Sequence, residues 1–144
     1  MGRSEIVMGI LLDTCAWIWL FQNDPKIAHS ACIEKIDEAA ARDKLYVASI
    51  SIREVGMLTS KKRIELNKSC GDWVREALSQ PGLSLAPLSP EIALESSYLP
   101  GHFHNDPADR MLVATARHLG LELVTADSKI IEYGRQGFVK VVPV

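Results

Sequence analysis

Four carboxylates stand beside the ends of short apolar segments, where one metal ion could neutralise them together. Asp13 closes the first such segment and Asp127 follows a later one. Glu54 lies about one turn into the helix expected after the second segment, and Asp109 opens another helix. Acids that converge on one edge of a fold repel one another unless a cation lies between them. Oxygen ligands without a cysteine or histidine cluster suit Mg²⁺ or Mn²⁺ better than zinc.

This set of ligands predicts hydrolysis of a phosphodiester. Bare carboxylates repel an anionic substrate, whereas a divalent ion attracts it, polarises the phosphoryl oxygen and lowers the pKa of a bound water. These carboxylates are the candidate ligands of the ion. The sequence leaves open which group orients the attacking water. It contains no GxSxG, Walker A or GxGxxG motif.

The elements that must position these acids form an alternating pattern. Short apolar segments predict five strands, and segments with helical spacing lie between them. The predicted strands are residues 9–12, 45–48, 83–86, 121–125 and 139–142. Apolar residues from Ile27 to Ala40 predict one helix that ends near Arg42. The alternation indicates a parallel sheet covered on both faces, with its active site beyond the carboxyl ends of the strands.

Each acid also has a purely structural explanation. Asp13, Asp106 and Asp127 each precede an expected helix, where an aspartate is a common N-cap. Ser51 and Glu54 match the S-x-x-E capping box. Taken singly, capping explains each residue. Their expected convergence on one edge favours the metal site.

Length and composition set further bounds. The 144 residues suit a single domain over 1–144, with residues 1–8 as an N-terminal extension. A net charge of −2 excludes nucleic-acid binding by bulk positive charge, so local basic patches or a bridging metal must bind any RNA. Three scattered cysteines indicate neither a zinc site nor a disulfide framework. The apolar stretch at 6–12 is too short to span a membrane, and we expect a cytoplasmic protein.

Four sequence blocks together resemble the PIN-domain family, and more narrowly its VapC toxins. The blocks are ILLDT at 10–14, SISIRE at 49–54, DPADRMLVA at 106–114 and LVTAD at 123–127. The resemblance implies an α/β fold, a PIN-like three-layer α/β/α domain with a five-stranded parallel sheet. It also implies a Mg²⁺- or Mn²⁺-dependent endoribonuclease that acts on RNA, forms a homodimer and is inhibited by a cognate antitoxin.

The resemblance also assigns site residues. The acidic set of the family falls on Asp13, Glu54, Asp109 and Asp127. On this basis we expect Asp13 and Asp109 to be the primary metal ligands, with the other two acids completing the pocket directly or through water. The supporting positions are Thr14, Ser51, Asp106, Thr125 and Arg110. For Arg110 we expect either a phosphate contact or a structural ion pair. Two departures, Arg53 and Ala108, replace residues that are often aromatic in the family but remove no carboxylate.

Other interpretations remain open. The loop histidines His102 and His104 are interpreted as ordinary loop residues rather than ligands. A non-catalytic PIN-like module that binds RNA or a protein partner is the main alternative, and retention of all four acids argues against it. A response-regulator receiver domain is disfavoured because Asp13 has no acidic neighbour and Pro143, rather than a lysine, lies near the end of the last strand.

Overall fold

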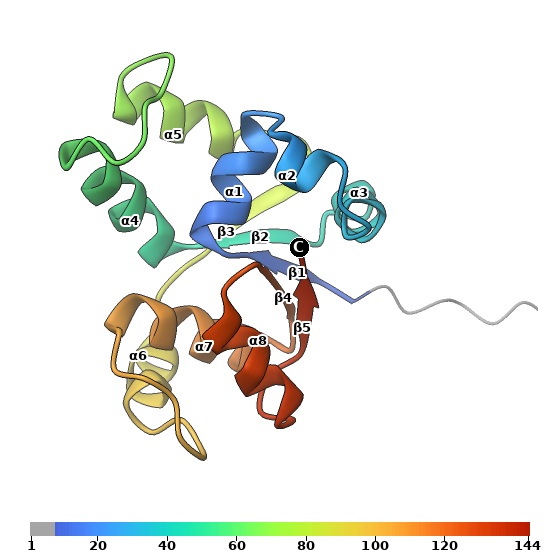
Figure 1. The fold of residues 1–144 in the computed structure, drawn as a ribbon, viewed down its shortest axis with the longest axis vertical. Coiled ribbons are helices and arrows are strands. Elements are labelled where there is room, and N and C mark those ends of the chain that lie inside the picture. Colours follow the sequence, from blue (N-terminus) through green and yellow to red (C-terminus); the bar gives the residue numbers. More distant parts are fainter. Residues whose placement is uncertain (1–7) are drawn as a thin grey trace, which may run out of the picture.

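A five-stranded parallel sheet forms the centre of the molecule (Figure 1). The computed structural model describes residues 8–144, so most of the proposed extension at 1–8 lies outside the described residues. The strands are β1 (Ile10–Leu12), β2 (Leu45–Ala48), β3 (Leu83–Ala86), β4 (Glu122–Thr125) and β5 (Val141–Pro143). Their order in the sheet is β3-β2-β1-β4-β5, and every neighbouring pair is parallel. The predicted fold class is confirmed.

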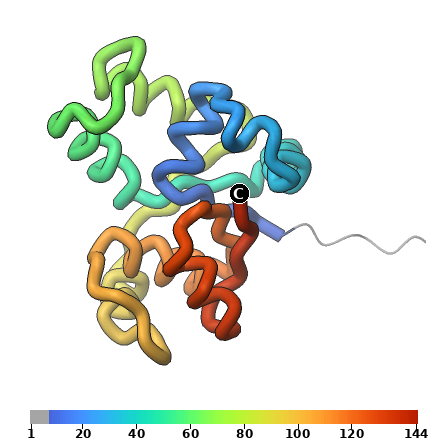
Figure 2. Tube along the Cα trace, in the orientation of Figure 1, coloured from blue at the N-terminus to red at the C-terminus, as the bar shows by residue number. Residues whose placement is uncertain are grey.

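Helices cover both faces of this sheet. The first face carries α1 (Thr14–Phe21), α2 (Pro25–Ala28), α3 (Ile33–Ala41), α4 (Ser49–Ser60) and α5 (Cys70–Leu78). The second face carries α6 (Pro90–Ser97), α7 (Pro107–Leu119) and α8 (Ser128–Arg135). The Cα trace shows the same three layers, with the sheet between the two groups of helices (Figure 2). No helix within residues 8–144 is long and apolar enough to cross a membrane.

The central strand β1 divides its side chains between two cores. Ile10 and Leu12 belong to the core under α1 to α5, and Leu11 belongs to the core under α6 to α8. Successive side chains of a strand point to opposite faces, so a strand buried on both sides has an unbroken apolar sequence. Trp17 and Trp73 pack edge to face in the first core with their ring centroids 5.1 Å apart.

The prediction of a single helix from Ile27 to Arg42 is wrong, because this segment forms two helices. The N-terminal helix α2 ends after Ala28, and α3 begins only at Ile33. Between them the Ser30 hydroxyl accepts a hydrogen bond from the N–H of Cys32 at 3.3 Å. Serine competes with helical hydrogen bonding in this way, and such competition is invisible in the apolar spacing.

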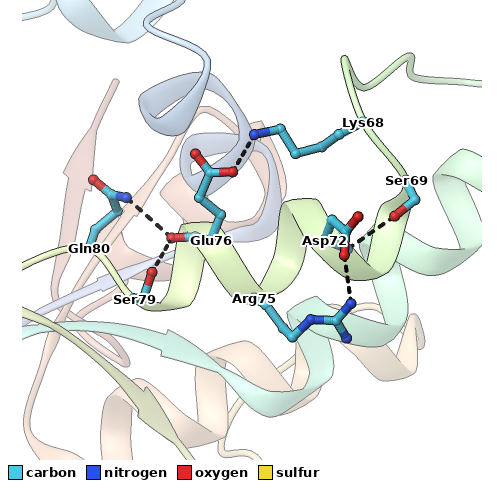
Figure 3. Close-up of polar contacts among 7 residues, drawn as sticks. All are labelled: Lys68, Ser69, Asp72, Arg75, Glu76, Ser79 and Gln80. Carbon is cyan, nitrogen blue, oxygen red and sulfur yellow. Dashed lines mark hydrogen bonds and ion pairs between the residues drawn. The ribbon is translucent and has the colours of Figure 1, made fainter.

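Helix α5 shows how the outer elements are fixed. The Ser69 side chain caps its first turn, and Asp72 forms an ion pair with Arg75 at 2.7 Å (Figure 3). Exposed ion pairs of this kind contribute little to stability. The helix is held mainly by Trp73 and Ala77, which are buried in the first core.

Candidate metal centre

The register of the sheet places Asp13 beside Thr125. Leu12 pairs with Val124, and the N–H of Asp13 donates to the carbonyl of Val124 at 3.0 Å. The Thr125 hydroxyl then donates to Asp13 Oδ2 at 2.6 Å, and the N–H of Ala16 donates to Oδ1 at 2.7 Å. Asp13 therefore caps α1, as the structural explanation requires, while its carboxylate is held in one orientation at the carboxyl end of β1.

The same threonine positions a second acid. The N–H of Asp127 donates to Thr125 Oγ1 at 3.0 Å. Asp127 Oδ2 accepts from the N–H of Ile130 at 3.0 Å and so caps α8. One buried hydroxyl thus connects the two strand-end aspartates. Asp13 and Asp127 therefore each cap a helix and also belong to the acidic cluster.

The capping box predicted at Ser51 and Glu54 is wrong. Helix α4 begins at Ser49, its N-cap is Ala48, and no side chain caps it. Ser51 is instead fully buried and accepts a hydrogen bond from the Thr14 hydroxyl at 2.9 Å. This bond joins α1 to α4 and sets the first turn of α4 against the end of β1. Burial, and then the charge of Asp106, raise the pKa of the Glu54 carboxyl, which lies one turn further on.

Asp109 lies where the electrostatic repulsion is greatest. Asp106 caps α7 through a bond from the N–H of Asp109 to its Oδ1 at 3.0 Å, and Asp106 itself is exposed. Burial raises the pKa of Asp109 to about 7, and the charges of the neighbouring acids add to the effect. In decreasing order these neighbours are Asp106, Asp127, Asp13 and Glu54. All four predicted acids thus lie close enough to interact.

A histidine joins this cluster. His104 Nε2 is 3.1 Å from Asp109 Oδ2, and one ligand atom each from His104, Asp109 and Asp127 lie within 4.8 Å of one another. His104 therefore contacts the acidic cluster, which its interpretation as an ordinary loop residue did not anticipate, whereas His102 is exposed. The available signal was its position, since His104 stands two residues before Asp106 and five before Asp109 in the same segment.

Arg110 forms no ion pair among the residues that the structure describes, and the expected phosphate contact stays a prediction. Its guanidinium donates to the carbonyl of Ser96 at 2.8 Å, of Phe103 at 3.0 Å and of His104 at 3.2 Å. It therefore ties the start of α7 to the end of α6 and to the loop that carries His104. Arg110 therefore affects the acidic cluster by positioning the loop that carries His104.

The donor set fits a divalent cation. Asp13 is buried, and burial raises its pKa despite the hydrogen bond from Thr125. Burial, and then the charges of the neighbouring acids, raise the pKa of Asp109, a cost that a bound cation would remove. The nearby thiol of Cys15 is no competing nucleophile, because desolvation and the same acids raise its pKa above its ordinary value. The arrangement can therefore hold a hard cation beside a polar, partly open edge of the sheet.

Replacing Thr125 by valine tests whether its hydroxyl organises the centre. The change keeps the shape of the side chain but removes the donor to Asp13 and the acceptor for the N–H of Asp127. We expect affinity for the divalent ion to fall about 10- to 100-fold, as is usual when a group that orients a metal ligand is lost. Metal titrations followed by calorimetry would measure this loss.

Thr115→Val is the matched control for that variant. Thr115 is also buried, but its hydroxyl donates to the carbonyl of Met111 within α7. It should change stability without changing metal affinity. Equal metal affinities for the two variants would show that Thr125 has only a structural role.

The comparisons with known proteins agree with this geometry. The profile of the PIN domain matches residues 10–136, so the chain belongs to the PIN domain family. Among curated proteins it is similar to Ribonuclease VapC22 of Mycobacterium tuberculosis (strain ATCC 25618 / H37Rv), with 31% identity over 121 residues that cover 84% of this chain and 88% of the relative.

Solved structures share the fold at lower identity. The VapBC2 structure from Rickettsia felis, bound to a promoter DNA fragment, has a matching chain with a TM-score of 0.67 and 15% identity. A DNA-bound VapBC structure from Salmonella typhimurium has one with a TM-score of 0.65 and 16% identity. Each match covers 94% of this chain and 98% of the other.

Proposed function

We propose that this protein is a metal-dependent endoribonuclease that acts as the toxin of a toxin–antitoxin pair. The observation that carries the proposal is the position of Asp109, whose pKa is raised to about 7 by burial and by the acids around it. Such crowding of carboxylates is costly in a metal-free fold and is relieved by a divalent cation. Perturbed acids at the carboxyl edge of a parallel sheet are typical of a functional site.

The similarity to Ribonuclease VapC22 supports RNA as the substrate. The cation is proposed to be Mg²⁺ or Mn²⁺, held by Asp13 and Asp109 with Glu54 and Asp127 completing the site. When bound, the ion supplies positive charge for the phosphoryl oxygen and lowers the pKa of the attacking water.

Side chains of the protein are proposed to perform the remaining catalytic roles. Thr125 donates to the Asp13 carboxylate and accepts from the backbone N–H of Asp127, so it orients the first acid and positions the backbone of the second before the reaction begins. Glu54 lies at the half-buried edge of the cluster with a raised pKa, so it is a candidate to accept the proton of the attacking water. The net charge of −2 gives little long-range attraction for RNA, which makes the ion the main local attraction for phosphate.

Protein partners belong to the same proposal. The VapBC structures with this fold are described as bound to DNA, and their shared fold is consistent with a cognate antitoxin for this chain. Leu94 on α6 and Tyr98 at the C-cap of that helix are 65% and 81% exposed. Large exposed apolar side chains favour a protein contact, which we assign to a homodimer or to the antitoxin.

The test is RNA cleavage by purified, antitoxin-free protein in a mixed RNA pool. The reaction is run with Mg²⁺, with Mn²⁺ and with EDTA, beside the Asp13→Ala/Asp109→Ala double variant. Cleavage that needs the ion and disappears in the folded variant supports the proposal. Failure of the folded wild-type protein to cut any RNA with either ion would favour the non-catalytic binding module.

A further inference from the structure

His104 contacts the acidic cluster although it is not one of the four predicted acids. Its Nε2 atom, Asp109 and Asp127 offer ligand atoms that all lie within 4.8 Å of one another. Ligands bound to one ion at about 2.0–2.2 Å can lie at most about 4.4 Å apart. Adjacent ligands lie closer together than that, and modest rotations of the side chains would bring this group to coordination distance.

The Nε2 atom is also buried without a hydrogen bond. Its 3.1 Å contact with Asp109 Oδ2 brings the two atoms together but does not have the angular geometry of an N–H···O bond. Buried polar atoms nearly always have a partner, and an exception calls for a missing water or ion. At this position the neighbouring carboxylates favour a cation.

The loop around His104 fixes its backbone and its ring. Arg110 donates to the carbonyls of Phe103 and His104. The Phe103 ring lies 4.5 Å from the imidazole and 4.8 Å from the ring of Tyr133, centroid to centroid. The Tyr133 hydroxyl donates to the carbonyl of Pro100 at the start of the loop. A side chain held in this way loses little conformational entropy when it binds an ion.

We propose that His104 Nε2 is a ligand of the divalent ion, and that this nitrogen gives the centre a preference for transition ions over Mg²⁺. The inference rests on the proposed function only in placing the ion among these acids. Imidazole nitrogen suits first-row transition ions, whereas Mg²⁺ is bound almost entirely through oxygen. One nitrogen with two carboxylates should therefore favour Mn²⁺ and, more strongly, Co²⁺, compared with a site made of oxygen alone.

The test measures ion binding to the full chain without RNA. Calorimetric titrations with Co²⁺, Mn²⁺ and Mg²⁺ compare the wild-type protein with His104→Gln, together with the visible absorption spectrum of the Co²⁺ form. We expect the variant to lose at least tenfold in Co²⁺ affinity and to shift the cobalt absorption bands. Its Mg²⁺ affinity should change less than threefold.

His102→Gln is the matched control, since His102 lies in the same loop but is exposed. It should bind all three ions as the wild type does. Equal losses of Co²⁺ and Mg²⁺ affinity in His104→Gln, or no loss of either, would overturn the proposal. If His104→Gln does not fold, pulsed EPR of the Mn²⁺ form of wild-type protein labelled with ¹⁵N-histidine decides the point, because a bound imidazole gives a nitrogen coupling and an unbound one does not.

These readouts separate the inference from the proposed function. If the ion is coordinated by nitrogen but the protein cuts no RNA, the proposed nuclease activity is contradicted and the assignment of His104 as a ligand is kept. Metal-dependent cleavage without a nitrogen coupling would contradict the ligand and leave the nuclease in place.

Discussion

Asp109→Asn is expected to abolish RNA cleavage and, at the same time, to stabilise the metal-free protein. The carboxylate is a proposed metal ligand, and loss of a primary ligand should reduce the rate at least 100-fold. The same charge is unfavourable in the fold without metal, because burial and four neighbouring acids raise the pKa of Asp109 to about 7. The amide removes that charge with almost no change in shape. After allowance for solvent screening the gain at pH 7.5 should be about 2 kcal/mol.

Asp106→Asn is the control for this experiment. Asp106 is the exposed N-cap residue of the same helix, and its carboxylate accepts a hydrogen bond from the N–H of Asp109. Asparagine is an equally good N-cap, so the helix should be kept. We expect cleavage within a few-fold of the wild-type rate. A stable Asp109→Asn protein that still cuts RNA, or an equal loss in both variants, would contradict the assignment of Asp109.

The stability of the metal-free protein should fall as the pH rises from about 4 to about 7. The folded-state pKa of Asp109 is raised from its ordinary value of 3.8 to about 7, so across this window the folded protein holds a proton that the unfolded chain has released. That contribution is present below about pH 4 and is lost as the pH passes 7. Burial raises the pKa values of Asp13 and Glu54 in the same direction, so they add to the trend.

Chemical denaturation in EDTA at pH 5.0 and pH 7.5 measures this difference, which we expect to be about 2 kcal/mol for Asp109 alone. In Asp109→Asn the free energy of unfolding should differ less between these two pH values. Saturating divalent ion should reverse the trend, because an ion binds the deprotonated carboxylates and stabilises the folded state at high pH. The account would be refuted if the metal-free wild-type protein became more stable from pH 5.0 to pH 7.5 and Asp109→Asn became more stable by the same amount.

The strands and the acids at their ends could be predicted because their signals are local. A run such as Ile10–Leu12 is apolar throughout because both of its faces are buried, and the polar residue that ends it must lie at the edge of the sheet. The position of Asp13 follows from that alone. Asp109 required in addition that the loop from Leu99 carry the start of α7 across to the same edge, and its carboxylate does lie within 4.8 Å of that of Asp127.

Two contacts of the site could not be predicted from local patterns in the sequence. Ser51 and Glu54 have the spacing of a capping box, but the hydrogen-bond partner of Ser51 is Thr14, which lies 37 residues away. His104 reaches the acids because Arg110 and Phe103 fix its loop, and none of these contacts can be read from spacing. Local sequence therefore predicts which groups end a strand, whereas tertiary contacts determine which additional groups join them.

The most direct test of the central claim is the identity of the nucleophile. A single RNA that the protein cuts is cleaved in H₂¹⁸O with the preferred ion, and the new ends are analysed by mass spectrometry at early times. If the acidic centre directs water at the phosphodiester, the new terminal phosphate carries one ¹⁸O and no 2′,3′-cyclic phosphate forms. Cyclic phosphate ends without ¹⁸O would show that the ribose 2′-hydroxyl is the nucleophile, and the proposed metal-centred hydrolysis would be wrong.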